Sequence, residues 1–171
     1  MAMTQDEILA PFRSGRHNHR TCVADALRAA EEICRDRGLR LTALRRRILE
    51  MIWNGHEPVR AYDLLDKLRG ERSGAAPPTV YRTLDFLCDC GLVHRIESLN
   101  AYVGCGDPRF HHAGQFLICQ DCRAVAELDS PEITEAIADK ARNAGFEVAG
   151  QTIEIAGLCP DCQGGGAADD A

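Results

Sequence analysis

The sequence predicts an α+β protein with two parts: a helical N-terminal domain that ends in a hairpin, followed by a small α/β domain. Three observations predict this fold. Four stretches have apolar residues at helical spacing and precede two short β-prone segments. Two Cys-x2-Cys pairs then flank a strand, helix and strand pattern. The charge also changes sign, because residues 1–100 have 16 Lys and Arg against 14 Asp and Glu, whereas residues 101–171 have 4 against 12.

The composition suits one mid-sized domain or two small ones, since 45% of the 171 residues are hydrophobic and 27% are charged. It excludes a fibrous or wholly disordered chain. No apolar run approaches the roughly 18 residues of a bilayer span, and the first twenty residues have no apolar signal region. We therefore expect a cytoplasmic protein without a membrane partner. In a reducing compartment, nine cysteines favour metal ligands or redox centres over disulfides.

The first domain is predicted over residues 21–104, after a polar segment at 1–20 that has no sustained period and predicts a flexible arm. Thr21 and Thr42 are expected to cap helices, and Gly38 to end the first one. Helices are expected over residues 21–38, 42–55 and 61–68, and from Pro77 to Gly91.

The fourth helix and the segment after it predict a winged helix-turn-helix. Proline at the first turn of the helix favours a start at Pro77, and 92–97 with 101–104 predict a hairpin, the wing. The fourth helix would then be the recognition helix, whose first turn presents Thr79, Tyr81 and Arg82 to base edges. The alternative is that these side chains only decorate a surface.

A basic run precedes that helix. Residues 35–47 contain six arginines against Asp36, and this local excess suits contact with phosphates. Arg45 and Arg46 are the candidates for such contacts. A solvated basic helix is the alternative.

The second domain is predicted over residues 115–162, after a connector at 105–114. Strands are expected at 116–119, 124–128 and 147–155. The helix between the last two strands is expected over 130–143, with Ser130 as cap and Pro131 in its first turn. Residues 163–171, which contain three glycines, predict a disordered tail.

The strongest local signal is the pair of Cys-x2-Cys motifs. Each turn brings two thiolates within about 4 Å of each other, and two turns close a tetrahedral four-thiolate zinc site that leaves no position for catalysis. The site would join both ends of the second domain. Redox-active cysteines are the alternative. The predicted structural zinc ligands are Cys119, Cys122, Cys159 and Cys162.

A second, looser set straddles the join between the domains: His94 in the hairpin, Cys105 after it, His111 and His112 in the connector, and Glu127 beyond Cys122. One thiolate, one or two imidazoles and a carboxylate suit zinc. A thiolate and a carboxylate together neutralise the charge of Zn²⁺, which lowers the cost of a partly buried ion.

The motif at residues 77–82, the hairpin at 93–98 and the twin cysteine pairs resemble the ferric uptake regulator family over roughly residues 21–162. The resemblance implies a cytosolic homodimer, which pairs a winged helix with a C-terminal dimerisation domain and binds palindromic operator DNA when loaded with metal. It also implies a structural zinc at the four cysteines.

A departure from the family pattern indicates which metal is sensed. Iron and peroxide sensors of this family have a His-His-Asp-His type run where this chain has residues 113–116, Ala-Gly-Gln-Phe. The zinc uptake branch instead uses ligands that correspond to His94, Cys105, His112 and Glu127, with His111 as the alternative to His112. The resemblance therefore implies a zinc-responsive repressor of zinc homeostasis genes with about two zinc ions per protomer, one structural and one regulatory.

Other classes of protein are the alternatives to this interpretation. An enzyme with a small-molecule substrate is not expected, because the sequence has no His-Glu-x-x-His, phosphate-loop or nucleophile motif. A zinc-stapled protein-interaction module would lack salt-dependent affinity for duplex DNA. A family member that senses another metal is the third alternative.

Overall fold

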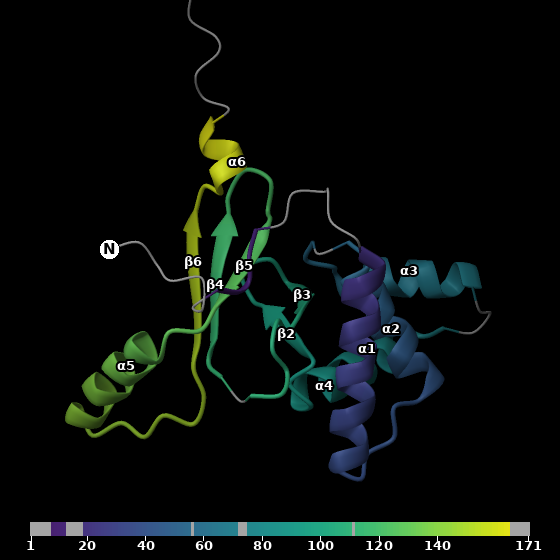
Figure 1. The fold of residues 1–171 in the computed structure, drawn as a ribbon, viewed down its shortest axis with the longest axis horizontal. Coiled ribbons are helices and arrows are strands. Elements are labelled where there is room, and N and C mark those ends of the chain that lie inside the picture. Colours follow the sequence, from purple (N-terminus) through teal and green to yellow (C-terminus); the bar gives the residue numbers. More distant parts are fainter. Residues whose placement is uncertain (1–7, 13–18, 56, 72–74, 111, 165–171) are drawn as a thin grey trace, which may run out of the picture. The chain divides into compact units, whose positions relative to one another are not determined.

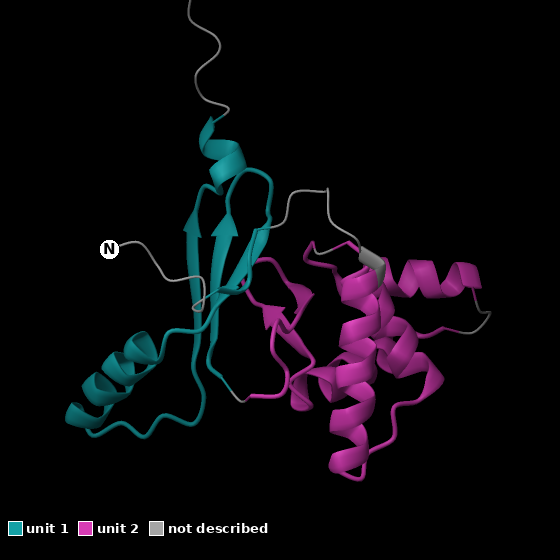
Figure 2. Ribbon diagram, viewed as in Figure 1, with its two compact units in different colours: residues 1–12, 112–171 teal, residues 13–111 magenta. Residues whose placement is uncertain are grey.

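The computed structural model describes residues 8–12, 19–55, 57–71, 75–110 and 112–164 (Figure 1). The chain divides into two compact units, one of residues 13–111 and the other of residues 1–12 with 112–171 (Figure 2). We call them the helical unit and the sheet unit.

The described residues of the helical unit form four helices: α1 (His19–Asp36), α2 (Ala43–Trp53), α3 (Ala61–Glu71) and α4 (Pro77–Asp89). The Thr42 hydroxyl accepts the Arg45 N–H at 3.4 Å, which confirms the predicted cap of α2, and Pro77 occupies the first turn of α4. Gly38 and Gly91 have φ of 65° and 72°, the left-handed values for which glycine is favoured after a helix. The apolar faces meet in a core whose most completely buried members include Ile48, Leu49, Ile52, Leu64, Leu65, Leu68, Val80, Leu84 and Leu87.

The predicted wing forms in this unit. Strands β2 (Val93–Ile96) and β3 (Ala101–Gly104) pair antiparallel, with Val93 opposite Gly104 and His94 opposite Val103. Tyr102 exchanges two backbone hydrogen bonds of 2.9 Å with Val59. The wing is therefore tied to the segment between α2 and α3.

The sheet unit has four strands in the order β1-β5-β4-β6. Its strands are β1 (Ile8–Ala10), β4 (Gly114–Cys119), β5 (Val125–Leu128) and β6 (Thr152–Gly157). The first three pair antiparallel, and β6 lies parallel to β4 at one edge. Helix α5 (Pro131–Asn143) lies in the connection from β5 to β6, and the short α6 (Pro160–Gln163) follows β6.

The structure differs from the sequence expectations at four places. Ile8–Ala10 pairs with β5, where an unstructured arm was expected, because three consecutive apolar residues add an edge strand. Helix α1 begins at His19, so Thr21 lies inside it and is not its cap. Ser130 occupies the N-cap position of α5 with Pro131 in the first turn, as expected, but its hydroxyl donates to the Glu132 carboxylate at 2.9 Å and accepts no backbone N–H of the helix. The last strand begins at Thr152, five residues later than expected.

Most of the predicted flexible segments, residues 1–7, 13–18 and 165–171, lie outside the described residues. Among the helices that are described, none combines the length and apolar character needed to cross a bilayer.

Candidate metal centres and nucleic-acid interface

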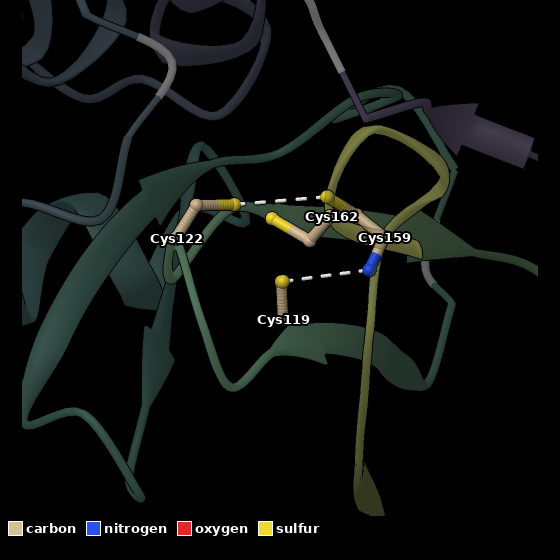
Figure 3. Close-up of side chains that lie close together, drawn as sticks. All are labelled: Cys119, Cys122, Cys159 and Cys162. Atoms are coloured by element: carbon tan, nitrogen blue, oxygen red, sulfur yellow. Dashed lines mark hydrogen bonds between the residues drawn. The ribbon is translucent and has the colours of Figure 1, made fainter. Parts of the chain in front are cut away.

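The four predicted zinc ligands come together in the sheet unit. Cys119 ends β4 and Cys122 follows in the turn to β5. After β6, Cys159 is the N-cap residue of α6 and Cys162 lies within that short helix. Because β4 and β6 are parallel neighbours, their carboxyl ends bring the two turns to the same end of the sheet. All four Sγ atoms lie within 4.8 Å of one another, and the side chains point toward a common centre (Figure 3).

The geometry of the cluster fits a tetrahedral zinc ion. With Zn–S bonds of about 2.3 Å, two sulfurs of a tetrahedron lie about 3.8 Å apart. The Sγ atoms of Cys122 and Cys159 are 3.7 Å apart. Four thiolates would complete the coordination of the ion, so its role there would be structural.

Backbone groups prepare the cluster for a cation. The Cys159 N–H donates to the Cys119 Sγ at 3.4 Å, and this bond, with the backbone of Cys122, lowers the pKa of Cys119 to about 6. Hydrogen bonds with the side chains of Asp121 and Cys159 raise the pKa of Cys162. A divalent cation that displaces the thiol protons would satisfy all four sulfurs.

Two of the four ligands in the second predicted set lie in the helical unit. His94 is in β2, and Cys105 directly follows β3 with its N–H donating to the Leu92 carbonyl at 3.1 Å. His94 is paired with Val103, so Cys105 is two residues further along the same face of the hairpin. Their ligand atoms lie within 4.8 Å of each other, and Cys105 is buried.

The other two lie in the sheet unit. His112 precedes β4 and Glu127 is in β5, and the Nε2 of His112 lies 2.8 Å from a carboxylate oxygen of Glu127. The carboxylate is 2% exposed, so an uncompensated charge there would be costly. Each unit therefore contains one pair of candidate donors. The alternative ligand, His111, lies outside the described residues.

Helix α4 has the two faces that a recognition helix needs. Val80, Thr83 and Leu84 are buried in the helical unit, and the Thr83 hydroxyl donates to the Thr79 carbonyl at 2.9 Å. The candidate base-contacting residues Thr79, Tyr81 and Arg82 are on the exposed face, with Tyr81 39% exposed.

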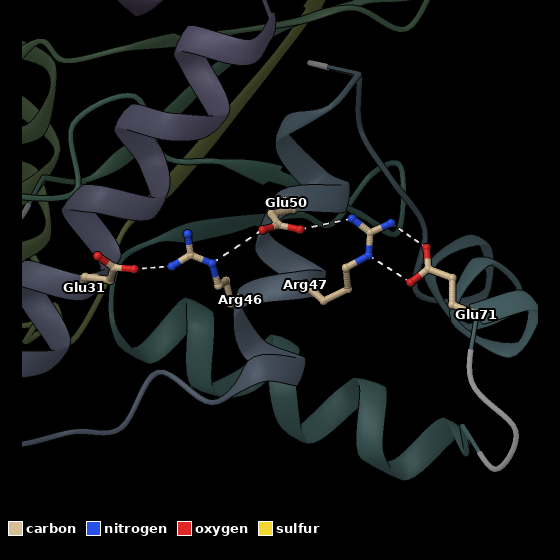
Figure 4. Close-up of polar contacts among 5 residues, drawn as sticks. All are labelled: Glu31, Arg46, Arg47, Glu50 and Glu71. Atoms are coloured by element: carbon tan, nitrogen blue, oxygen red, sulfur yellow. Dashed lines mark hydrogen bonds and ion pairs between the residues drawn. The ribbon is translucent and has the colours of Figure 1, made fainter.

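The basic run is less cationic than its composition indicates. Arg46 pairs with Glu31 of α1 and with Glu50 at 3.6 Å, and Arg47 pairs with Glu50 at 3.0 Å and with Glu71 of α3 at 2.9 Å (Figure 4). This chain of ion pairs joins three helices. The contact with Arg47 lowers the pKa of Glu71. The sequence alone indicates an excess of positive charge at these arginines. Their partners Glu31 and Glu71 are distant in sequence, so the pairing becomes visible only in the structure.

Arg45 is held differently from Arg46. Its guanidinium lies 3.3 Å from the centre of the Phe86 ring on α4 and donates to the Arg40 carbonyl at 2.6 Å. Neither partner carries a negative charge, so the charge of Arg45 is not neutralised and lies next to α4.

Fold and sites together define the class: a winged-helix protein with a cluster of four cysteines and a second set of zinc-type donors. Residues 36–156 match the ferric uptake regulator family, and the chain belongs to that family. The members of this family are regulators, which agrees with the expectation that the chain is not an enzyme.

Known proteins resemble the chain over most of its length. It is 40% identical over 145 residues to the zinc uptake regulation protein of Escherichia coli strain K12, a match that covers 84% of each chain. A zinc uptake regulator solved in complex with zinc and DNA has a TM-score of 0.80 and 38% identity, covering 83% of this chain and 95% of that one. A crystal structure of holo XcZur has a TM-score of 0.76 and 42% identity, covering 82% and 98% respectively.

Proposed function

We propose that the protein is a cytoplasmic, zinc-responsive transcriptional repressor that binds palindromic operator DNA as a homodimer and controls zinc homeostasis genes. One observation carries the proposal. The recognition helix and one pair of zinc-type donors belong to the helical unit, and a second such pair belongs to the sheet unit. The relatives named for zinc uptake regulation, and the one solved with zinc and DNA, support zinc and DNA as the ligands.

Two zinc ions per protomer follow from the donor sets. The four-cysteine cluster would hold one ion permanently and so stabilise the end of the sheet. The second ion would be held by His94 and Cys105 together with His112 and Glu127. A Cys thiolate and the Glu127 carboxylate match its charge of +2.

The sensing step depends on protons that these side chains release. His112 and Glu127 share a hydrogen bond that must be given up when both become ligands, and Cys105 must lose its thiol proton. Bound zinc would supply a cross-link that joins the four side chains. The helical unit is then held in one orientation, which shifts the population towards the form that binds DNA.

The sheet unit offers a surface for dimerisation. Helix α5 has no buried residue in the single chain, and Ile133 and Ile137 are exposed on it. Phe146, Ile155 and Leu158 are also exposed, and Phe146 is 66% exposed. Apolar side chains in this number are typical of an interface, and a second copy would bury them.

The test is a zinc titration of the purified protein, with zinc per protomer and affinity for palindromic DNA measured on the same samples. We expect one zinc that resists a mild chelator, a second that does not, and DNA affinity that follows the second. Equal affinity for operator and random DNA at all zinc levels would favour an interaction module. Stronger activation by another divalent metal would favour a different sensor.

A further inference from the structure

Trp53 lies directly against the backbone of the wing. It is the last residue of α2, and its indole occupies the place where any residue other than glycine at position 104 would have a side chain. A Cβ on Gly104 would lie 2.3 Å from Cε2, 2.4 Å from Nε1 and 2.6 Å from Cζ2 of this ring. The φ of Gly104 is outside the left-handed region, so glycine is required here by the close approach of the ring.

The contact is next to a predicted zinc ligand. Gly104 pairs with Val93 in the hairpin and is covered by the Trp53 indole. The residue that follows Gly104 in the chain is Cys105. Trp53 and Cys105 also line the same cavity of about 200 Å³, together with Cys22, Leu92 and other residues. The backbone that presents the Cys105 thiol is therefore held by the hairpin and by the ring.

We propose that Trp53 is a positioning residue for zinc sensing: it fixes the backbone of Gly104 so that Cys105 is held where the ion requires it. The inference rests on the proposed regulatory zinc site. A Zn–S bond is about 2.3 Å long and tolerates only about 0.2 Å of error, so a backbone shift of about 1 Å at residue 104 misplaces the sulfur. Loss of such supporting contacts typically lowers metal affinity about 10- to 100-fold.

The experiment measures the affinity of the full-length protein for its second zinc, by competition with a chromogenic chelator. Trp53→Leu removes the ring and Gly104→Ala pushes it away, and each should weaken the second zinc about 10- to 100-fold. The structural zinc should stay at one per protomer. Gly70→Ala in α3 is the matched control, because a Cβ there meets no atom within 4 Å, and it should leave zinc affinity unchanged.

The double variant separates positioning from general destabilisation. The methyl group at position 104 and the indole compete for the same space, so Gly104→Ala combined with Trp53→Leu should bind the second zinc more tightly than Gly104→Ala alone. If the losses of zinc affinity in the two single variants add up in the double variant, the two residues act separately, and the proposal is wrong. So would single variants that melt at lower temperature but keep wild-type zinc affinity.

Trp53 also supplies a spectroscopic readout, because it is the only tryptophan of the chain. Its emission should change as the second zinc binds to wild type, and the change should disappear in Cys105→Ser. If the emission does not change while the second zinc binds, Trp53 is not coupled to the zinc site, and the proposed positioning role is wrong. A wild-type protein that binds no second zinc would instead refute the proposed function itself.

Discussion

The two units are stabilised in different ways. The helical unit surrounds a continuous apolar core to which all four helices contribute. The sheet unit has α5 without a buried residue and several exposed apolar side chains, and four cysteines join the turns after β4 and β6. A zinc ion at these cysteines would do for the sheet unit part of what apolar packing does for the helical unit. Because the helical unit has an apolar core of its own, we predict that it folds without a metal at His94 and Cys105.

The largest expected effect is loss of the cluster in the sheet unit. Cys162→Ser should release the structural zinc and unfold this unit, giving monomers or aggregates. Zinc binding in small domains contributes roughly 10–16 kcal/mol, comparable to the roughly 5–15 kcal/mol that stabilises a whole domain. Sedimentation and zinc content measure the outcome.

Cys88→Ser is the control for that variant, because Cys88 lies in the helical unit, outside both donor sets, where burial raises its pKa to about 11. It should remain dimeric with full zinc content. A Cys162→Ser protein that stays a dimer with two zinc ions per protomer would show that the cluster has no structural role.

Cys105→Ser should affect folding less than Cys162→Ser does, but it should abolish zinc sensing. The helical unit should keep its core and the dimer its structural zinc, while the second zinc and zinc-stimulated DNA binding are lost. Circular dichroism, zinc content and DNA binding by fluorescence anisotropy distinguish these outcomes. Zinc-dependent DNA binding with an unchanged midpoint would exclude Cys105 as a sensing ligand.

At the recognition helix, Arg82→Ala should weaken operator binding by about 1–3 kcal/mol and relax the preference at one position of each half-site. Zinc content should not change, because Arg82 is exposed on α4 and belongs to neither predicted donor set. The measurement compares affinity for operator variants at fixed salt. If operator affinity and base preference are both unaltered, Arg82 on α4 does not read the bases.

The smallest effects are expected in the basic run, where the structure separates two neighbours. Arg45 keeps its charge, so Arg45→Ala should lower the slope of log affinity against log salt by about 0.9, as for one phosphate contact. Arg46 is already paired with Glu31 and Glu50, so Arg46→Ala should change the slope less and cost about 0–1 kcal/mol of stability. Equal slopes for both variants would refute this distinction.

The sequence predicted the elements that depend on local pattern. Helical periodicity, the cap at Thr42 and the first-turn proline at Pro77 located the helices of the helical unit, and the Cys-x2-Cys spacing identified a cluster that the structure brings together. These signals are strong because each is contained in a few turns of chain.

Features that depend on distant partners were missed. Ile8–Ala10 is too short to show a period, and it is a strand only because β5 offers an edge. The pairing of Arg46 with Glu31 requires α1 to lie against α2, and the approach of Trp53 to Gly104 requires the wing to pack on α2. Neither packing can be read from residue spacing.

The central claim is that one zinc ion uses donors from both units, and zinc stoichiometry in a double variant tests it most directly. His94→Ala removes a donor of the helical unit and Glu127→Ala a donor of the sheet unit. We predict that each single variant retains one zinc per protomer instead of two, and that the double variant also retains one, with zinc-stimulated DNA binding lost equally in all three. If the two pairs bind separate ions, zinc content will instead fall further in the double variant than in either single variant, and the claim will be wrong.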